Sequence, residues 1–201
     1  MKLVIIGGSG TIGSHVYKAF VNEHKVVLAS RSSKTFPVDI SQMDSIRALF
    51  RSTGNVDAVI CIAGEAKWAA FDELSESDFY IGIKSKLMGQ VNLVKVAKEY
   101  LNPGGSITLT SGILGEFPVP MTTSAALVNG ALHSFVKAFK QDFPQGPRLN
   151  VVAPGLVEDA YEKYKDYFPG HFPVPMDRVV EGYKQSVLGS DHGALIRIYE
   201  P

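Results

Sequence analysis

Cysteine is almost missing from this chain. Cys61 is the single cysteine among 201 residues, so the chain cannot form an internal disulfide, and this composition is typical of a reducing compartment. The chain also has no net charge at pH 7, because its 20 basic residues balance its 20 acidic ones. The balance gives no electrostatic reason to expect nucleic acid or a membrane surface as a partner.

Long hydrophobic runs are also lacking. No apolar stretch approaches the roughly 18 residues of a membrane-spanning helix, and the start of the chain resembles no cleavable signal. We therefore expect a cytoplasmic protein with no membrane partner. The histidines show no metal-ligand spacing, so we expect no metal site and interpret them as surface or packing residues. They are His15, His24, His133, His171 and His192.

What is present is a regular alternation of apolar runs and helical patterns. The strand-like runs are Leu3–Ile6, Val26–Ala29, Ala58–Ile62, Ser106–Thr110, Leu149–Ala153 and Ala194–Ile198. The helical patterns are about Thr11–Asn22, Ser41–Arg51, Ser75–Tyr100, Thr122–Asp142 and Asp177–Val187. This order predicts a single α/β domain over residues 1–201, with a parallel sheet between helices and ligands at the carboxyl ends of the strands.

A glycine-rich turn joins the first strand to the first helix. The spacing Gly7-x-x-Gly10-x-x-Gly13 allows the backbone to approach a pyrophosphate, and the helix N-terminus favours its negative charge. The predicted cofactor contacts here are Gly7, Ser9, Gly10, Thr11, Ile12 and Gly13. The alternative is a tight turn between strand and helix that holds no ligand.

The turn after the second strand carries a basic residue instead of an acidic one. Arg31, between Ser30 and Ser32, suits the 2′-phosphate of NADP, whereas an acidic residue would suit the 2′-hydroxyl of NAD. We therefore expect NADP, with NAD as the other possibility. The alternative interpretation of Arg31 is a solvated surface side chain.

Two later segments extend the predicted dinucleotide site. Asp39, followed by Ile40, can place a polar side chain against the adenine amino group, or else cap the helix that begins near Ser41. Ala63 and Gly64 leave room for the backbone to pass close to a cofactor, unless they form an ordinary turn at the end of a strand.

These motifs together resemble the short-chain dehydrogenase/reductase family, compact single-domain type, over nearly the whole chain. The run Gly105–Ser111 is similar to the family's strand that ends at a catalytic serine. The run Asn150–Gly155 is similar to the stretch that borders the nicotinamide, through Pro154 and Gly155. The resemblance implies a three-layer Rossmann-like fold with seven strands, NAD(P) binding, action on alcohols or carbonyls, and homodimers or homotetramers.

The family's catalytic pair is missing. The resemblance implies a Tyr-x-x-x-Lys pair on one helix, but the aligned positions hold Ala125 and Asn129. Lys86 stands where the family has an asparagine, so only Ser111 remains of the usual tetrad. Alanine cannot transfer a proton and asparagine carries no charge. The resemblance therefore supports the cofactor site and departs from the usual mechanism.

Other residues are candidates for the missing role. Lys86 could contact the cofactor ribose or lower a neighbouring pKa, or it could be a solvated lysine. The segment 156–176 is predicted to cover the substrate pocket, and its tyrosines are possible acids or simply packing residues. These tyrosines are Tyr161, Tyr164 and Tyr167. The hydroxyls of residues 122–124 are predicted to cap the following helix.

Two functions remain open from the sequence. The first is an NADP-dependent oxidoreductase with Ser111 and Lys86 as candidate catalytic residues and an unidentified small-molecule alcohol or carbonyl substrate. The second is a non-catalytic NADP(H)-binding sensor or scaffold; a nucleotide-sugar enzyme is disfavoured because the chain is short. A hydrolase is not expected, because Ser111 lacks a Gly-x-Ser-x-Gly setting and no partner histidine is evident. The resemblance places a dimer interface on the helices Ser75–Tyr100 and Thr122–Asp142, although they can equally pack on the protein's own sheet.

Overall fold

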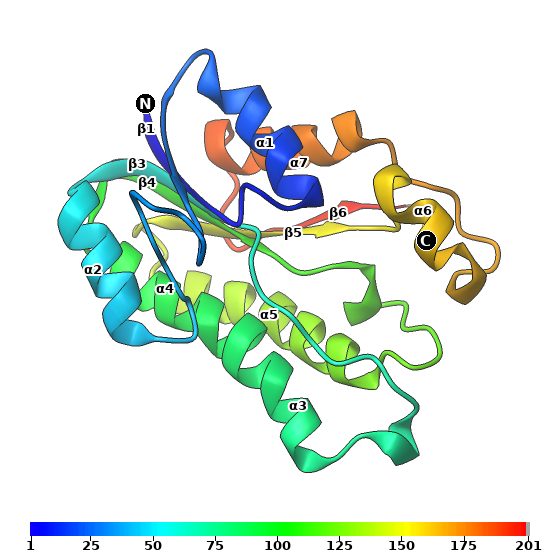
Figure 1. The fold of residues 1–201 in the computed structure, drawn as a ribbon. Helices are drawn as coiled ribbons and strands as arrows, with labels where there is room; N and C mark the ends of the chain where they lie inside the picture. Colours follow the sequence, from blue (N-terminus) through cyan, green and yellow to red (C-terminus); the bar gives the residue numbers. More distant parts are fainter. Residues whose placement is uncertain (200–201) are drawn as a thin grey trace.

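One parallel sheet forms the centre of the molecule (Figure 1). The computed structural model describes residues 1–199. In these residues six strands pair in the order β2-β1-β3-β4-β5-β6, and every pair is parallel. The strands are β1 (Lys2–Ile6), β2 (Lys25–Ala29), β3 (Val56–Cys61), β4 (Leu101–Thr110), β5 (Arg148–Pro154) and β6 (Leu195–Ile198). This arrangement confirms the predicted α/β fold.

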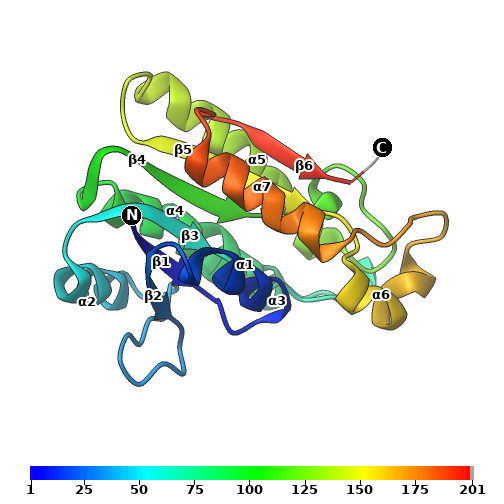
Figure 2. The ribbon, with the colours of Figure 1, turned by 90° about the horizontal axis from the view of Figure 1, so that it is seen from above.

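Helices cover both faces of the sheet (Figures 1 and 2). Helices α1 (Thr11–Val21) and α7 (Met176–Leu188) lie side by side on one face. Helices α2 (Met43–Thr53), α4 (Gly89–Ala97) and α5 (Thr123–Asp142) lie on the other. The result is the three-layer Rossmann-like architecture, because strands that are buried on both faces need a helical layer on each side.

The described part of the sheet has six strands instead of the seven that the resemblance implies. After β2 the chain returns at once, and residues 30–37 form only an isolated parallel bridge between Ser30 and Pro37. A parallel neighbour needs a crossover of roughly a dozen residues or more, and residues 31–36 are too few for one. Strand β2 is therefore the edge of the sheet on this side.

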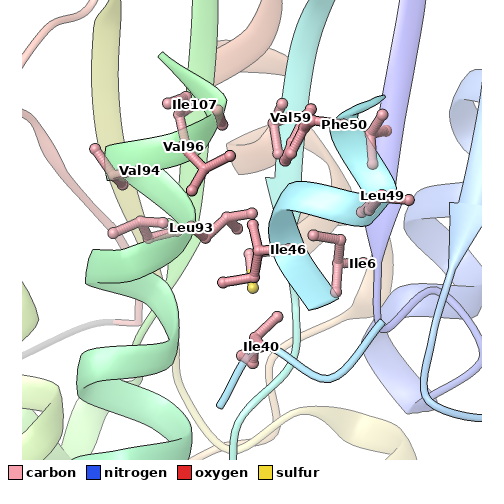
Figure 3. Packing of buried hydrophobic residues seen from close by; sticks show 14 of the residues in the cluster. Ile6, Ile40, Ile46, Leu49, Phe50, Val59, Leu93, Val94, Val96 and Ile107 are labelled. Atoms are coloured by element: carbon pink, nitrogen blue, oxygen red, sulfur yellow. The ribbon is translucent and has the colours of Figure 1, made fainter. Parts of the chain in front are cut away.

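Apolar side chains from the sheet and from α2 and α4 interlock in the larger core cluster (Figure 3). Ile6, Val59 and Ile107 project from neighbouring strands, and Ile46 and Leu93 meet them from the helices. All five are fully buried or nearly so. Each such side chain contributes roughly 1.5–3 kcal/mol by leaving water, so this layer holds the strand ends that carry the site in fixed positions.

The predicted helix over residues 75–100 is interrupted. It consists of α3 (Glu76–Gly82), a π-helical turn over Ile83–Met88 and then α4. Short π-helical turns occur mostly inside α-helices and often at functional sites, and this turn contains the predicted Lys86. The pattern also missed α6 (Glu158–Tyr164), which lies inside the predicted covering segment. Among the described residues, no helix is long and apolar enough to cross a membrane.

Candidate functional site

Of the three glycines in the Gly7-x-x-Gly10-x-x-Gly13 spacing, Gly7 and Gly13 are required by backbone packing, whereas Gly10 is not. Gly7 has φ +83°, and a Cβ there would lie 2.8 Å from the carbonyl oxygen of Ile62. A Cβ on Gly13 would collide with the carbonyl oxygen of Gly7. A Cβ on Gly10, in contrast, would make only an ordinary contact of 3.5 Å with that oxygen. The fold therefore accounts for Gly7 and Gly13, whereas Gly10 leaves open space in front of the helix.

Helix α1 begins at this open space, and no side chain within residues 1–199 caps it. Gly10 is the N-cap residue and supplies no side chain, and the first turn contains no acidic residue. The first N–H groups of a helix need acceptors, and the helix dipole favours an anion at this position. The space left at Gly10 and the uncapped helix start together fit the pyrophosphate of a dinucleotide.

A cleft of about 320 Å³ lies at this point, beside the carboxyl ends of β1 and β3. The strand order changes direction between these two strands, which is where ligands of such sheets bind. Most of the predicted cofactor residues line this cleft. They are Gly7, Ser9, Gly10, Ser30, Arg31, Ser32, Asp39, Ile40, Ala63 and Gly64. Thr11 and Gly13 do not line it, and Ile12, Pro154 and Gly155 line a second cavity described below.

Two polar side chains of the cleft, Arg31 and Asp39, interact with neighbouring polar residues. Arg31 lies 3.6 Å from Glu65, with 72% and 58% of the two side chains exposed, so the guanidinium remains accessible to a phosphate. Asp39 accepts hydrogen bonds from the backbone N–H and the hydroxyl of Ser41, which lower the pKa of its carboxyl group. Asp39 therefore organises the turn before α2 and also lines the cleft.

The second cavity, of about 280 Å³, is lined mainly by apolar side chains. Its walls include Trp68, Leu156 and Phe168, and Tyr164 packs with its ring centre 5.3 Å from that of Trp68. Residues of the predicted covering segment 156–176 thus form part of this wall. Tyr164 lines the cavity, whereas Tyr161 and Tyr167 do not appear among its lining residues.

Ser111 and Asn129 supply polar side chains to this cavity. Ser111 follows β4 and is buried, and its Oγ lies 2.8 Å from Nε2 of His133. The expectation that Ser111 has no partner histidine is therefore wrong. His133 is likewise not simply a packing residue, because its ring nitrogen meets the predicted catalytic hydroxyl. The side-chain oxygen of Asn129 is buried and has no hydrogen-bond partner among residues 1–199.

Three buried residues follow one another along α5 at intervals of four: Ala125, Asn129 and His133. This spacing places them on one face of the helix. Ala125 packs in an apolar cluster with Ile113 and Leu156. The interval of four was visible in the sequence and could have identified His133 as a neighbour of the two substituted positions.

A charged group near His133 is itself held in place. Glu116 accepts hydrogen bonds from Arg197 at 2.6 and 2.7 Å and from Tyr199 at 2.5 Å. The bonds from Arg197 and Tyr199 lower the pKa of Glu116 to about 2, so the carboxylate is charged at neutral pH. Burial lowers the pKa of His133, and the negative charge of Glu116 opposes that shift.

Lys86 lines neither cavity, but it lies against Gly64, which lines the first cleft. A Cβ on Gly64 would be 2.8 Å from the Cα of Lys86 and 2.9 Å from its Cγ, so the two chain segments are in close contact. Lys86 is half-buried, and burial lowers its pKa to about 8, so the lysine is only partly solvated. The hydroxyl of Thr122 bonds to Val119 and does not cap α5, contrary to the expectation for residues 122–124.

Comparison with known proteins places this geometry in a family. The chain matches the family model described as enoyl-(acyl carrier protein) reductase over residues 13–171. A short chain dehydrogenase/reductase from Cryptosporiopsis sp. is 27% identical over 177 residues, a match that covers 80% of this chain and 67% of that protein.

Two solved structures extend the likeness to nearly every residue. The protein lin1944 from Listeria innocua is 38% identical with a TM-score of 0.95, covering 99% of this chain and all of that chain. A small-chain dehydrogenase solved in complex with NADPH is 27% identical with a TM-score of 0.86, covering 99% and 96%. From its fold, its glycine-rich turn and these matches, the chain belongs to the short-chain dehydrogenase/reductase family.

Proposed function

We propose that this protein is an NADP(H)-dependent oxidoreductase that acts on a small, largely apolar alcohol or carbonyl compound. The observation that carries the proposal is the uncapped start of α1 at Gly10, facing a cleft that Arg31 also lines. The NADPH complex of a family member with 27% identity supports the same assignment. Arg31 favours the 2′-phosphate form of the cofactor because its guanidinium can bind a phosphate with two parallel hydrogen bonds.

We assign a role to each cavity from the residues that line it. The cleft at β1 and β3 would hold the dinucleotide, and the bound nicotinamide would donate or accept hydride. The second cavity would hold the substrate, because its apolar walls exclude water and Ser111 and Asn129 supply the polar contacts to a reacting oxygen. Ile12, Pro154 and Gly155 line the second cavity, as residues at its border with the cofactor should. The covering segment 156–176 would determine which substrates fit.

Binding and turnover can be separated in one experiment. Calorimetry measures the affinities for NADPH and NADH, and the nicotinamide absorbance is then followed in the same samples with a panel of small apolar alcohols and carbonyl compounds. The proposal expects tight NADPH binding, weaker NADH binding and turnover with part of the panel. Absence of nucleotide binding would contradict the cofactor assignment, and binding without turnover would favour the second candidate.

That second candidate is a non-catalytic NADP(H)-binding sensor or scaffold. It is favoured by one observation: Ala125, at the family's tyrosine position, is buried in an apolar cluster and cannot transfer a proton. A sensor would bind a partner protein differently with and without NADPH, and measured hydride transfer would exclude it.

The proposal includes self-association as a homodimer or homotetramer. Tyr80, Ile81 and Met88 along α3 and the π-helical turn, and Leu127 on α5, are exposed apolar residues on the two predicted interface helices, with 40–46% of each accessible. Sedimentation at micromolar concentration tests this part, and a monomer throughout would contradict it.

A further inference from the structure

The contact between Ser111 and His133 joins the candidate substrate cavity to a second proton-carrying group. We propose that His133 exchanges the substrate's hydroxyl proton through Ser111 and so replaces the tyrosine that is absent at position 125. This inference rests on the proposed oxidoreductase function and deepens it. It identifies a relay of two side chains in which Ser111 would touch the substrate oxygen and His133 would act through Ser111.

The geometry provides the first argument. The Oγ of Ser111 is 2.8 Å from Nε2 of His133, a normal hydrogen-bond length, and both residues are buried. Ser111 directly follows β4 and His133 lies in the middle of α5, so these two regular elements fix the relative positions of the two side chains. Ser111 lines the second cavity, whereas His133 does not, and the proton therefore has to pass through the serine hydroxyl.

The unpartnered amide oxygen of Asn129 provides the second argument. This atom is buried, lies one helical turn before His133 on α5 and has no hydrogen-bond partner within residues 1–199. A buried polar atom without a partner is unfavourable, and a bound hydroxyl group would supply the missing partner. The oxygen of Asn129 can accept a hydrogen bond from a ligand hydroxyl in the same cavity that Ser111 lines.

The charges around His133 favour a base that is neutral at rest. Burial lowers the pKa of the imidazole below its ordinary value of 6.5, and the cations of Arg197 and Lys137 act in the same direction. Glu116 opposes them, and its carboxylate is held by Arg197 and Tyr199. His133 is therefore uncharged at neutral pH, and Glu116 supplies negative charge close to the imidazolium that forms when a proton arrives.

The step balances in the direction of alcohol oxidation. The substrate O–H bond breaks and its proton moves to Oγ of Ser111, while the original hydroxyl proton of Ser111 moves to Nε2 of His133. The oxidised nicotinamide, held in the cleft at β1 and β3, would supply the acceptor for the hydride that leaves the carbinol carbon as the carbonyl group forms. His133 ends as imidazolium and then releases its proton to solvent. Carbonyl reduction is the same sequence reversed.

Two substitutions of His133 separate proton transfer from structure. His133→Gln retains a polar group that can bond to Ser111 but does not titrate, and His133→Ala removes the contact. The relay predicts that both variants lose about 10²-fold or more in kcat for alcohol oxidation, with NADPH affinity within twofold of the wild type. A purely structural role predicts that His133→Gln remains active. His24→Gln, which changes a histidine that packs beside Phe20 and lines neither cavity, is the matched control.

The pH profile and the proton position give further readouts. Wild-type kcat for alcohol oxidation should fall as the pH drops through the pKa of His133, and this decrease should vanish in His133→Gln. Independently of any substrate, the imidazole ¹⁵N shifts of the labelled protein near pH 8 report which ring nitrogen carries the proton, with His133→Gln used for assignment. The relay requires the proton on Nδ1, so that Nε2 can accept from Ser111.

The outcomes distinguish the two proposals. A proton on Nε2 near pH 8, or wild-type kcat in His133→Gln, overturns the relay even if the protein is an oxidoreductase. Failure of the wild type and of His24→Gln to bind NADPH overturns the proposed function and the hydride step with it. A proton on Nδ1 together with an inactive His133→Gln that binds NADPH normally supports the relay.

Discussion

Gly115 lies directly against the imidazole of His133. A Cβ on Gly115 would be 2.5 Å from Cε1 of that ring and 3.0 Å from the backbone nitrogen of Gly130. The short helical turn Ile113–Gly115 therefore packs on α5 in a way that only glycine permits, and it holds the ring toward Ser111. The position of the buried pair thus depends on a residue that has no side chain.

Substitution of this glycine should disturb the pair without touching either member. Gly115→Ala is expected to displace the ring of His133 and to lower the free energy of unfolding by about 1–3 kcal/mol, as overpacking does. Gly130→Ala is the matched control, because its Cβ would make an ordinary contact of 3.6 Å and alanine favours the helix. Urea unfolding measures the stability of both variants, and the ¹⁵N shifts of His133 report the displacement. Equal stability of the two variants would show that the turn can move away.

Alanine at two positions of the glycine-rich turn should affect different properties: Gly10→Ala should reduce NADPH affinity, and Gly13→Ala should reduce stability. Gly10→Ala should leave the free energy of unfolding within about 1 kcal/mol of the wild type, since the new Cβ meets only Gly7 at 3.5 Å. Its NADPH affinity should fall tenfold or more, which corresponds to about 1.4 kcal/mol, because the Cβ enters the space proposed for the phosphates. Gly13→Ala should instead destabilise the fold. Calorimetry with urea unfolding measures both effects, and unchanged NADPH affinity in Gly10→Ala would contradict the phosphate assignment.

The preference for NADP is assigned to a single side chain. Arg31→Asp should reverse the ratio of NADPH to NADH affinity, because a carboxylate repels the 2′-phosphate and can accept from a ribose hydroxyl. Lys34→Asp introduces the same charge change in the same loop, outside the cleft lining, and should leave the order of preference intact. The ratio is obtained by titration of each variant with both nucleotides. An unchanged ratio in Arg31→Asp would contradict the assignment.

Lys86 should leave a signature in the dependence of stability on pH. Its pKa is lowered from 10.5 to about 8 in the folded protein by burial, so between these values the unfolded chain binds the proton more tightly. The free energy of unfolding should therefore rise as the pH increases from about 8 to about 10.5. Lys86→Met should lack this rise, whereas Lys84→Met, on the exposed side of the same turn, should retain it. Urea unfolding across this range measures the difference, and parallel curves for wild type and Lys86→Met would contradict the prediction.

The sequence revealed the parts of the site that are local along the chain. The glycine spacing and Arg31 each lie within a few residues of a strand end, so periodicity and turn chemistry were enough to place them in one cleft. The contact between Ser111 and His133 joins β4 to α5. The interval of four places His133 on the helix face of Ala125 and Asn129, but no local pattern shows how that face is rotated against the sheet. The interruption of the helix at Ile83–Met88 was hidden for a similar reason, because the same residue types also form regular helix.

The early return of the chain after β2 leaves this strand at the edge of the sheet, where another chain could pair with it. An outermost strand can act as a template on which another chain adds a strand, and proteins commonly blunt such borders with proline, charge and short length. Strand β2 spans only Lys25–Ala29, and Pro37, which has no N–H, makes the isolated bridge beside it. Lys34 adds charge to the same loop, with its side chain exposed. The loop that places Arg31 at the cleft therefore also carries features that disfavour the addition of a strand from another chain at β2.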